Sequence, residues 1–269
     1  MSSPIRNPDD NLLYNYYSHD ALNYLIDLLN LYYQSYQNQI AKAPQADPLS
    51  LKKKSILRFE IIARFCHYVE ILLAFYIGYD SVPNPKSDGS HILDKLSKYT
   101  VKDTDNVCTV VSKMNNLSLA RAENDSLRRV FGYSILLSKI PTNSIDDSLT
   151  NIVEILSDVC GIYNFFKLSY NAYKHGYRLW FGSDPSGTEV AQYIVRGGKT
   201  NFVPSTKESF EIVLKCSKYC RMLFDIMIDN HKKINEFYTS GMSSGSVELS
   251  FLTSPSKDSY MIEKEVCAV

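Results

Sequence analysis

The sequence has no excess of either charge. Its 269 residues include 29 Lys and Arg and 29 Asp and Glu, so the formal net charge is zero. A neutral protein has no overall positive field to attract nucleic acid, although the same counts allow a local basic patch. The sequence also has one tryptophan beside 20 tyrosines and 12 phenylalanines. Tyrosines at helical spacing usually pack in cores and at helix contacts.

Long apolar runs and targeting signals are also lacking. The longest uninterrupted apolar run, 71–77, is far shorter than the roughly 20 residues that span a bilayer. The N-terminus is polar and has no signal-peptide pattern. Cys267 is third from the end, so the prenylation box, which needs the fourth-last position, is absent. We therefore expect a cytoplasmic protein that does not associate with membranes and keeps its six cysteines reduced.

The motifs of several large enzyme classes are missing. The sequence contains no phosphate-binding loop, dinucleotide fingerprint, His-Glu-x-x-His zinc motif or nucleophile elbow, which disfavours the corresponding enzymes. Cys216 and Cys220 are one helical turn apart, but no nearby cysteine or histidine pair completes a zinc site. We expect buried structural cysteines, no metal and no cofactor.

Apolar residues recur at spacings of three and four in several long segments. This spacing predicts a mostly α-helical protein, an antiparallel bundle of about four or five long helices. The segment 80–104 is predicted to be a loop with one short helix near 92–99. The long helices are expected over 9–43, 50–79, 107–139 with a weak point near Asn115, 144–174 and 205–238.

The helix expected over 50–79 is apolar on nearly every side, so it should lie in the middle of the bundle. Its few polar residues share one face: Glu60, Arg64, His67 and, one turn further, Glu70. This face is either a structural ladder of ion pairs or a set of groups that orients His175. Among the five histidines, only His67 and His175 lie in helices that the pattern places centrally.

Two parts of the sequence depart from the helical pattern. Residues 177–203 contain short strand-like runs separated by turn residues, which predicts a small β-hairpin or meander inserted before the last long helix. This insertion carries Trp180 and Phe181. Serine and glycine dominate from Thr239 onward, so we expect one helical domain over 1–240 and a disordered tail over 241–269.

The most informative segment is the end of the helix expected over 144–174. Lys174 and His175 occupy its last turn, Gly176 fits a helix stop, and Asn171 lies one turn before the histidine. Arg178 follows directly. These groups are either an ordinary helix cap, a contact for a partner, or a site for phosphate or another anion with His175 as acid or base.

The segment Tyr170-Asn-Ala-Tyr-Lys-His-Gly176 resembles divergent members of the HEPN superfamily of helical-bundle proteins, over roughly 148–178. Catalytic members carry an arginine, four to six residues and a histidine, and cleave RNA without metal across a dimer interface. The resemblance implies that His175 is the catalytic histidine. At the arginine spacing this sequence has Leu168, Ser169 and Tyr170, and Asn171 and Lys174 are candidates for part of the arginine's role.

The resemblance implies a cytosolic homodimer that binds or cleaves RNA or nucleotides, in stress or phage defence. The catalytic residues would be His175, Lys174 and Asn171, with Arg178 holding phosphate. Glu70, His67 and Arg64 would also bind substrate, and Glu60 or Glu70 would set the histidine tautomer. The alternative is a non-catalytic module for interaction or dimerisation, in which the Lys-His-Gly corner is structural and Trp180 and Phe181 contact a protein partner. A small-ligand sensor lined by tyrosines is a third interpretation.

Overall fold

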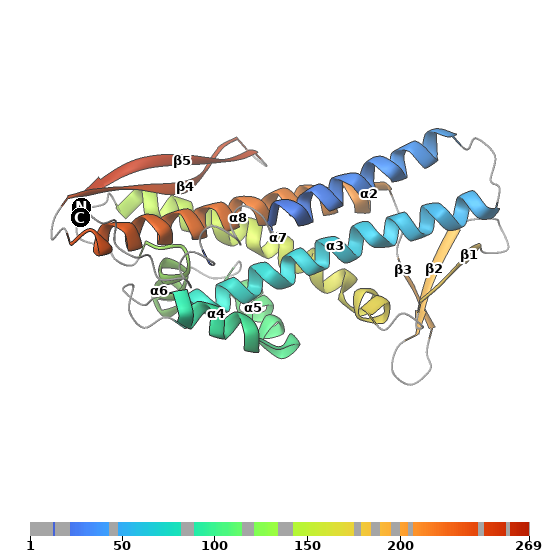
Figure 1. Ribbon diagram of the computed structural model, residues 1–269, viewed down its shortest axis with the longest axis horizontal. Helices are drawn as coiled ribbons and strands as arrows, with labels where there is room; N and C mark the ends of the chain where they lie inside the picture. The colour runs from blue at the N-terminus through green and yellow to red at the C-terminus, as the bar shows by residue number, and fades with distance from the viewer. Residues whose placement is uncertain are drawn as a thin grey trace, which may run out of the picture. The chain divides into compact units, whose positions relative to one another are not determined.

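The computed structural model is mostly helical, and Figure 1 labels its elements. It describes residues 13, 22–42, 48–81, 89–114, 121–133, 142–174, 179–183, 189–194, 200–203, 207–241, 245–256 and 259–268. The helices are α2 (Leu22–Lys42), α3 (Pro48–Asp80), α4 (Gly89–Lys98), α5 (Val101–Met114), α6 (Arg121–Val130), α7 (Thr142–Lys174) and α8 (Lys207–Thr239). The strands are β1 (Leu179–Ser183), β2 (Glu189–Ile194), β3 (Thr200–Val203), β4 (Ser246–Ser256) and β5 (Ser259–Ala268).

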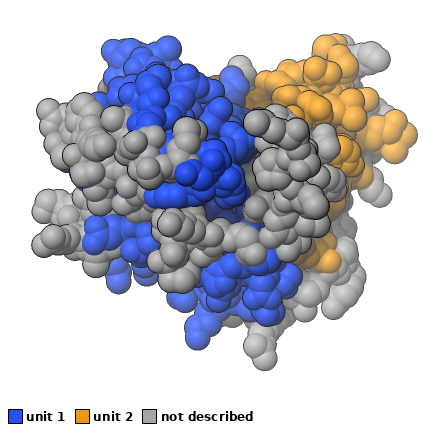
Figure 2. Space-filling view, turned by 60° about the vertical axis from the view of Figure 1, so that its left-hand side comes forward, with its two compact units in different colours: residues 1–22, 70–160, 218–269 blue, residues 23–69, 161–217 orange. Residues whose placement is uncertain are grey.

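The chain forms two compact units, and each is assembled from separate stretches of sequence (Figure 2). Unit 1 comprises 1–22, 70–160 and 218–269, and unit 2 comprises 23–69 and 161–217. The division falls within α3, α7 and α8, so each of these helices contributes residues to both units. The single domain predicted over 1–240 stays a prediction, because units that share continuous helices are also compatible with one domain.

The long helices agree well with the spacing of apolar residues. α2, α3, α7 and α8 correspond to four of the predicted segments, and α7 ends at Lys174 as predicted. The predicted start of the first helix near Asp9 lies outside the described residues. The predicted loop over 80–104 is wrong at its end, because α5 begins at Val101. Thr100 and Asp103 bond each other's backbone N–H groups there, a capping box that starts the helix.

α3 is buried on most of its circumference, as its composition predicts. Runs such as 61–63 and 72–76 are buried without interruption. Among the described residues, Ile56–Asp80 is long and apolar enough, by length and composition alone, to cross a membrane. This stretch is longer than the uninterrupted apolar run 71–77, because a few polar residues interrupt it. Of its most apolar window, 78% is buried inside the protein, as in a helix that forms part of a core.

The predicted β insertion is confirmed as a three-stranded antiparallel meander in unit 2, in the order β1-β2-β3. Phe181 lies opposite Ala191, and Ala191 lies opposite Val203. The turn residues between the strands lie outside the described part of the chain.

The disordered tail predicted over 241–269 is wrong, because β4 and β5 form an antiparallel hairpin within it. The Ser- and Gly-rich composition near Thr239 was misleading, since an alternating strand pattern follows it. Val247, Leu249 and Phe251 alternate along β4, and all three are buried. The hairpin therefore contributes to the core of unit 1.

Side chains from helices cover the free edge of β4. The backbone N–H and C=O of Ser250 bond the Asn230 side chain of α8, and those of Leu252 bond Ser148 and Asn151 of α7. Positions 250 and 252 are two residues apart, so their backbone groups point to the same edge of the strand. The helices thus satisfy polar groups that another strand would otherwise bond, and they fix the hairpin in place.

Candidate functional site

The described part of the predicted site lies at the end of α7, in unit 2. Lys174 is exposed in the last helical turn, and its ammonium lies 4.3 Å from the centroid of the Tyr170 ring. Tyr170 is itself buried, so it gives the lysine a fixed cation–π partner one turn away. A positive charge at a helix C-terminus is also favoured by the helix dipole. His175, Gly176 and Arg178 lie outside the described residues.

α3 contacts this end of α7 through Tyr173. The Tyr173 hydroxyl donates a hydrogen bond to the Glu60 carboxylate, and its ring lies 5.3 Å from that of Phe59. Burial raises the pKa of Tyr173 to about 12, and the carboxylate acts in the same direction. Arg64 lies 3.5 Å from Glu60 on the same helix. The structure therefore brings Glu60 and Arg64 to the helix turn that precedes His175.

The rest of the predicted polar face of α3 lies in different surroundings. His67 is exposed, whereas Glu70 is buried and belongs to unit 1. The charge of Glu70 acts on Tyr99, whose pKa is raised first by burial and then by this carboxylate. The four residues thus share a helix face without sharing an environment. The roles predicted for Glu60 and Glu70 in setting the tautomer of His175 stay predictions.

Asn171 is half-buried on α7, and two exposed apolar residues precede it on the same side of the helix. Phe165 and Leu168 are each 56% exposed, and the steps from 165 to 168 to 171 are of three residues. Of the eleven large hydrophobic residues exposed in the described part of the chain, seven belong to unit 2. Trp180 and Phe181 lie in β1, opposite Gln192 and Ala191, and their side chains are not among those described.

The net charge of the whole sequence is zero, but the two units differ in charge. The sequence ranges of unit 2 hold 13 Lys and Arg against 7 Asp and Glu, whereas those of unit 1 hold 16 against 22. All of the predicted site residues except Glu70 lie in the ranges of the positive unit. The sequence could not reveal this division, because each unit combines distant stretches of chain.

His231, on α8 in unit 1, is a histidine that the sequence pattern did not single out. Its ring stacks on Tyr79 at 3.9 Å between centroids, and its Nε2 lies 3.0 Å from the carbonyl oxygens of both Arg129 and Val130. Carbonyls only accept hydrogen bonds, so Nε2 carries the proton and caps the end of α6. Burial lowers the pKa of His231 to about 4. This histidine is structural, and the expectation that only His67 and His175 lie centrally is wrong.

The six cysteines are buried thiols, which confirms the structural interpretation. Among the residues with described positions, no cluster of three or more His, Cys, Asp or Glu is arranged to hold a metal ion. Cys108, Cys160 and Cys220 come together from α5, α7 and α8. A hydrogen bond to Cys108, followed by burial, raises the pKa of the Cys160 thiol. Such thiols are poor nucleophiles.

Comparison with known proteins leaves the family open. No protein-family model matches this sequence, and no curated protein or solved structure shows significant similarity to it.

Proposed function

We propose that unit 2 binds RNA, with the end of α7 as the point of contact. The observation that carries this proposal is the segregation of charge: a neutral chain has a unit with 13 basic and 7 acidic residues, and that unit holds the Lys174-His175 segment. A polyanion gains affinity from such a local surplus of positive charge. The exposed ammonium of Lys174 and the aromatic side chain of Phe165 are the kinds of group that contact phosphates and bases.

Cleavage of the bound RNA is the second part of the proposal. His175 would take the proton of a 2′-hydroxyl, whose oxygen then attacks the adjacent phosphorus. The bond from phosphorus to the 5′-oxygen breaks, and that oxygen takes up a proton. Lys174 would stabilise charge on the phosphate oxygens, and Asn171 would orient the phosphate. This assignment rests on the resemblance to HEPN proteins, as do a homodimer and a role in defence. An antiparallel-bundle arrangement and a cytoplasmic location are proposed from the spacing of apolar residues and the lack of targeting signals.

The binding test compares two lysines in matched positions. Lys174 and Lys113 are both exposed in the last turn of a helix, but they lie in unit 2 and unit 1. We expect Lys174→Ala to weaken RNA binding about 3- to 10-fold and to lower the salt dependence of binding by about one phosphate contact. Lys113→Ala should bind like the wild type in the same fluorescence-anisotropy titrations. Equal effects of the two substitutions would contradict the proposed contact.

The cleavage test uses an end-labelled RNA pool in EDTA, with His175→Ala of matched stability as the control. Cleavage that is lost in the variant supports the catalytic role of His175. If the wild type binds RNA without cleaving it, the cleavage part of the proposal is contradicted and the binding part stands.

The alternative of a non-catalytic interaction module is favoured by one observation, the exposed apolar side chains of unit 2, such as Phe165 and Leu168. A helix face of this kind is typical of a surface that another protein covers. If RNA neither binds nor is cleaved, sedimentation of the wild type and of Phe165→Ala across a concentration series tests self-association directly.

A further inference from the structure

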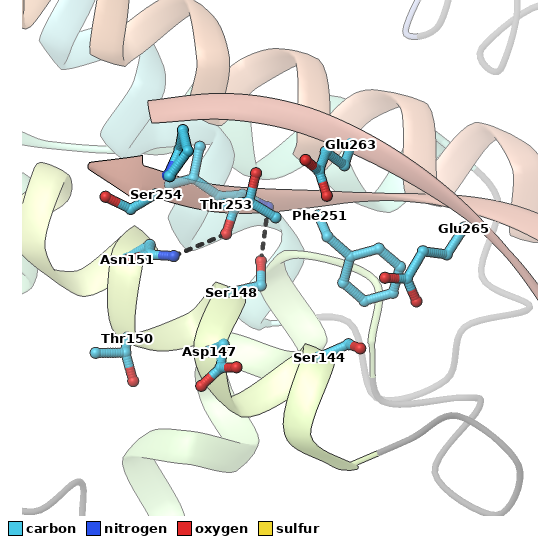
Figure 3. A pocket seen from close by; sticks show the side chains of 12 residues that line it. Ser144, Asp147, Ser148, Thr150, Asn151, Phe251, Thr253, Ser254, Glu263 and Glu265 are labelled. Carbon is cyan, nitrogen blue, oxygen red and sulfur yellow. Dashed lines mark hydrogen bonds between the residues drawn. The ribbon is translucent and has the colours of Figure 1, made fainter. Parts of the chain in front are cut away.

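A hollow of about 440 Å³ lies in unit 1, between the first turns of α7 and the C-terminal hairpin. Figure 3 shows the side chains that line it. α7 contributes Ser144, Asp147, Ser148, Thr150 and Asn151, and the hairpin contributes 251–255, Glu263 and Glu265. None of these residues belongs to the RNA site proposed in unit 2.

The walls of this hollow are held in place by direct bonds. Asn151 donates to the carbonyl oxygen of Leu252 at 2.9 Å, and Ser148 accepts from its N–H at 2.9 Å, as the dashed lines in Figure 3 show. Phe251 is 1% exposed and stacks on Tyr133 with 5.2 Å between ring centroids. A strand fixed by these bonds and by a buried ring keeps its position, so the pocket exists before a ligand enters.

Side chains alternate between the two faces of β5, so the acidic and basic side chains of this strand lie on opposite faces. Glu263 lies directly opposite Phe251 in the strand pairing, so it shares the face of the sheet that lines the pocket. Glu265 is two residues further along and has the same orientation. Lys264 points to the other face, where its ammonium lies 3.9 Å from Asp229 and 4.0 Å from Glu248. The neighbouring lysine is therefore directed away from the two pocket carboxylates.

The charged side chains that line the pocket are all of one sign. The twelve lining residues within the described part of the chain include three carboxylates, Asp147, Glu263 and Glu265, and no Lys, Arg or His. The pocket lies in the unit that has more acidic than basic residues. Anions are disfavoured there. The carboxylates are also not grouped as metal ligands in the described residues, so a small inorganic cation has no chelating set.

We propose that this pocket binds a small organic polyamine, a flexible chain with two or more ammonium groups. The methylene groups would lie against Pro255, an exposed residue that lines the pocket. The ammonium groups would approach Glu263 and Glu265, with the exposed Asp147 at the rim. Four hydroxyl-bearing residues, Ser144, Thr150, Thr253 and Ser254, add hydrogen-bond acceptors around the opening.

Isothermal titration of the full-length protein with spermidine tests this proposal. The wild type should bind spermidine with saturable one-site behaviour, and the neutral diol 1,8-octanediol should not bind. The double variant Glu263→Gln/Glu265→Gln keeps the side-chain shapes and should weaken binding at least about tenfold. Glu248→Gln is the matched control, because Glu248 is exposed on the same hairpin and does not line the pocket. It should bind like the wild type.

Several results would overturn the polyamine site. Circular dichroism first establishes that each variant is folded. Absence of spermidine binding to the folded wild type at millimolar concentration would refute the proposal. Equal weakening by Glu248→Gln would mean that the general field of the unit is responsible. Displacement of spermidine by magnesium at equal ionic strength would show an ordinary counter-ion effect.

Discussion

At the scale of single residues, His67 and His231 differ in their surroundings. His67 is exposed on α3, whereas His231 stacks on Tyr79 and caps α6. The sequence shows both as histidines within helical patterns, so periodicity alone does not distinguish them. The deciding partners of His231 are carbonyl oxygens about 100 positions away, at Arg129 and Val130. Long-range backbone contacts of this kind leave no signal in the local sequence.

His231 should make folding stability depend on pH. Its pKa is about 4 in the folded protein and 6.5 when unperturbed, so between these values the unfolded state binds a proton that the folded state does not. Stability due to this group is therefore present above pH 6.5 and is lost as the pH falls toward 4. The loss amounts to about 2–3 kcal/mol.

The test is urea unfolding of wild type and His231→Phe at pH 7.5, 6 and 4.5. The variant keeps an aromatic ring against Tyr79 but loses both hydrogen bonds, so we expect it to be about 2 kcal/mol less stable at pH 7.5. The gap should close on acidification, because phenylalanine does not titrate. A gap that stays constant across the pH range would contradict the assigned protonation. His231→Gln, whose amide can donate to the same carbonyls, should recover part of the loss at pH 7.5.

At the scale of elements, the C-terminal hairpin shows why turn-like composition is a poor guide to disorder. β4 has a clear alternation at Val247, Leu249 and Phe251, yet an isolated two-stranded hairpin is marginal in water. It becomes stable here because Asn230, Ser148 and Asn151 bond its outer edge. The opposite edge of the hairpin, on β5, carries Glu263, Lys264 and Glu265, a run of charges that discourages pairing with another strand.

Asn230 should be the strongest anchor of the hairpin. It is fully buried, donates to Phe131 and Ser250, and accepts from the N–H of Ser250. Gly132 leaves the space for it, since a Cβ there would lie 2.9 Å from that of Asn230 and the backbone has φ of 76°. We expect Asn230→Ala to cost about 3 kcal/mol in urea unfolding, because the N–H of Ser250 and the carbonyl of Phe131 lose their partner and the carbonyl of Ser250 keeps only the Tyr133 hydroxyl.

The matched comparison is Asn151→Ala. Asn151 is half-buried and makes one hydrogen bond to the same strand, so its loss should cost only about 1 kcal/mol. Similar costs for the two substitutions would mean that the hairpin is not held mainly by Asn230.

Periodicity predicted the long helices and the meander because those patterns are local. α7 and α8 follow spacings of three and four, α3 is a long and nearly continuous apolar segment, and α7 ends where the Lys174-His175-Gly176 signal places the stop. The candidate site could be predicted only in part. The approach of Glu60 to Tyr173 connects residues 113 positions apart, and the charge division depends on which stretches share a unit. Neither feature has a signature at short range in the sequence.

At the scale of the whole molecule, two units are joined by continuous helices. α3, α7 and α8 each have 33 residues and pass through the division between the units. A helix interior has no flexible linker, and melting one half of a helix exposes the backbone of the other half. Two units connected in this way should unfold together, unlike domains joined by a loop.

Joint unfolding of the two units can be tested with the single tryptophan, because Trp180 belongs to unit 2. Its fluorescence follows that unit, whereas far-UV circular dichroism follows the helices of both. We expect the two urea transitions to coincide within error, as two-state unfolding requires. A fluorescence midpoint clearly below the circular-dichroism midpoint, or a biphasic circular-dichroism curve, would show that the units unfold separately.

The assembly of each unit from distant stretches also has a consequence for the protein while it is being made. Unit 2 needs residues up to 217, so a ribosome must have passed that codon before this unit has all of its chain. Ser148 and Asn151 are synthesised about a hundred codons before Leu252, the strand residue that they bond. During that interval α7 exists without the hairpin that bonds its polar side chains. A nascent chain of this protein should therefore offer chaperones an incomplete surface for much of its synthesis.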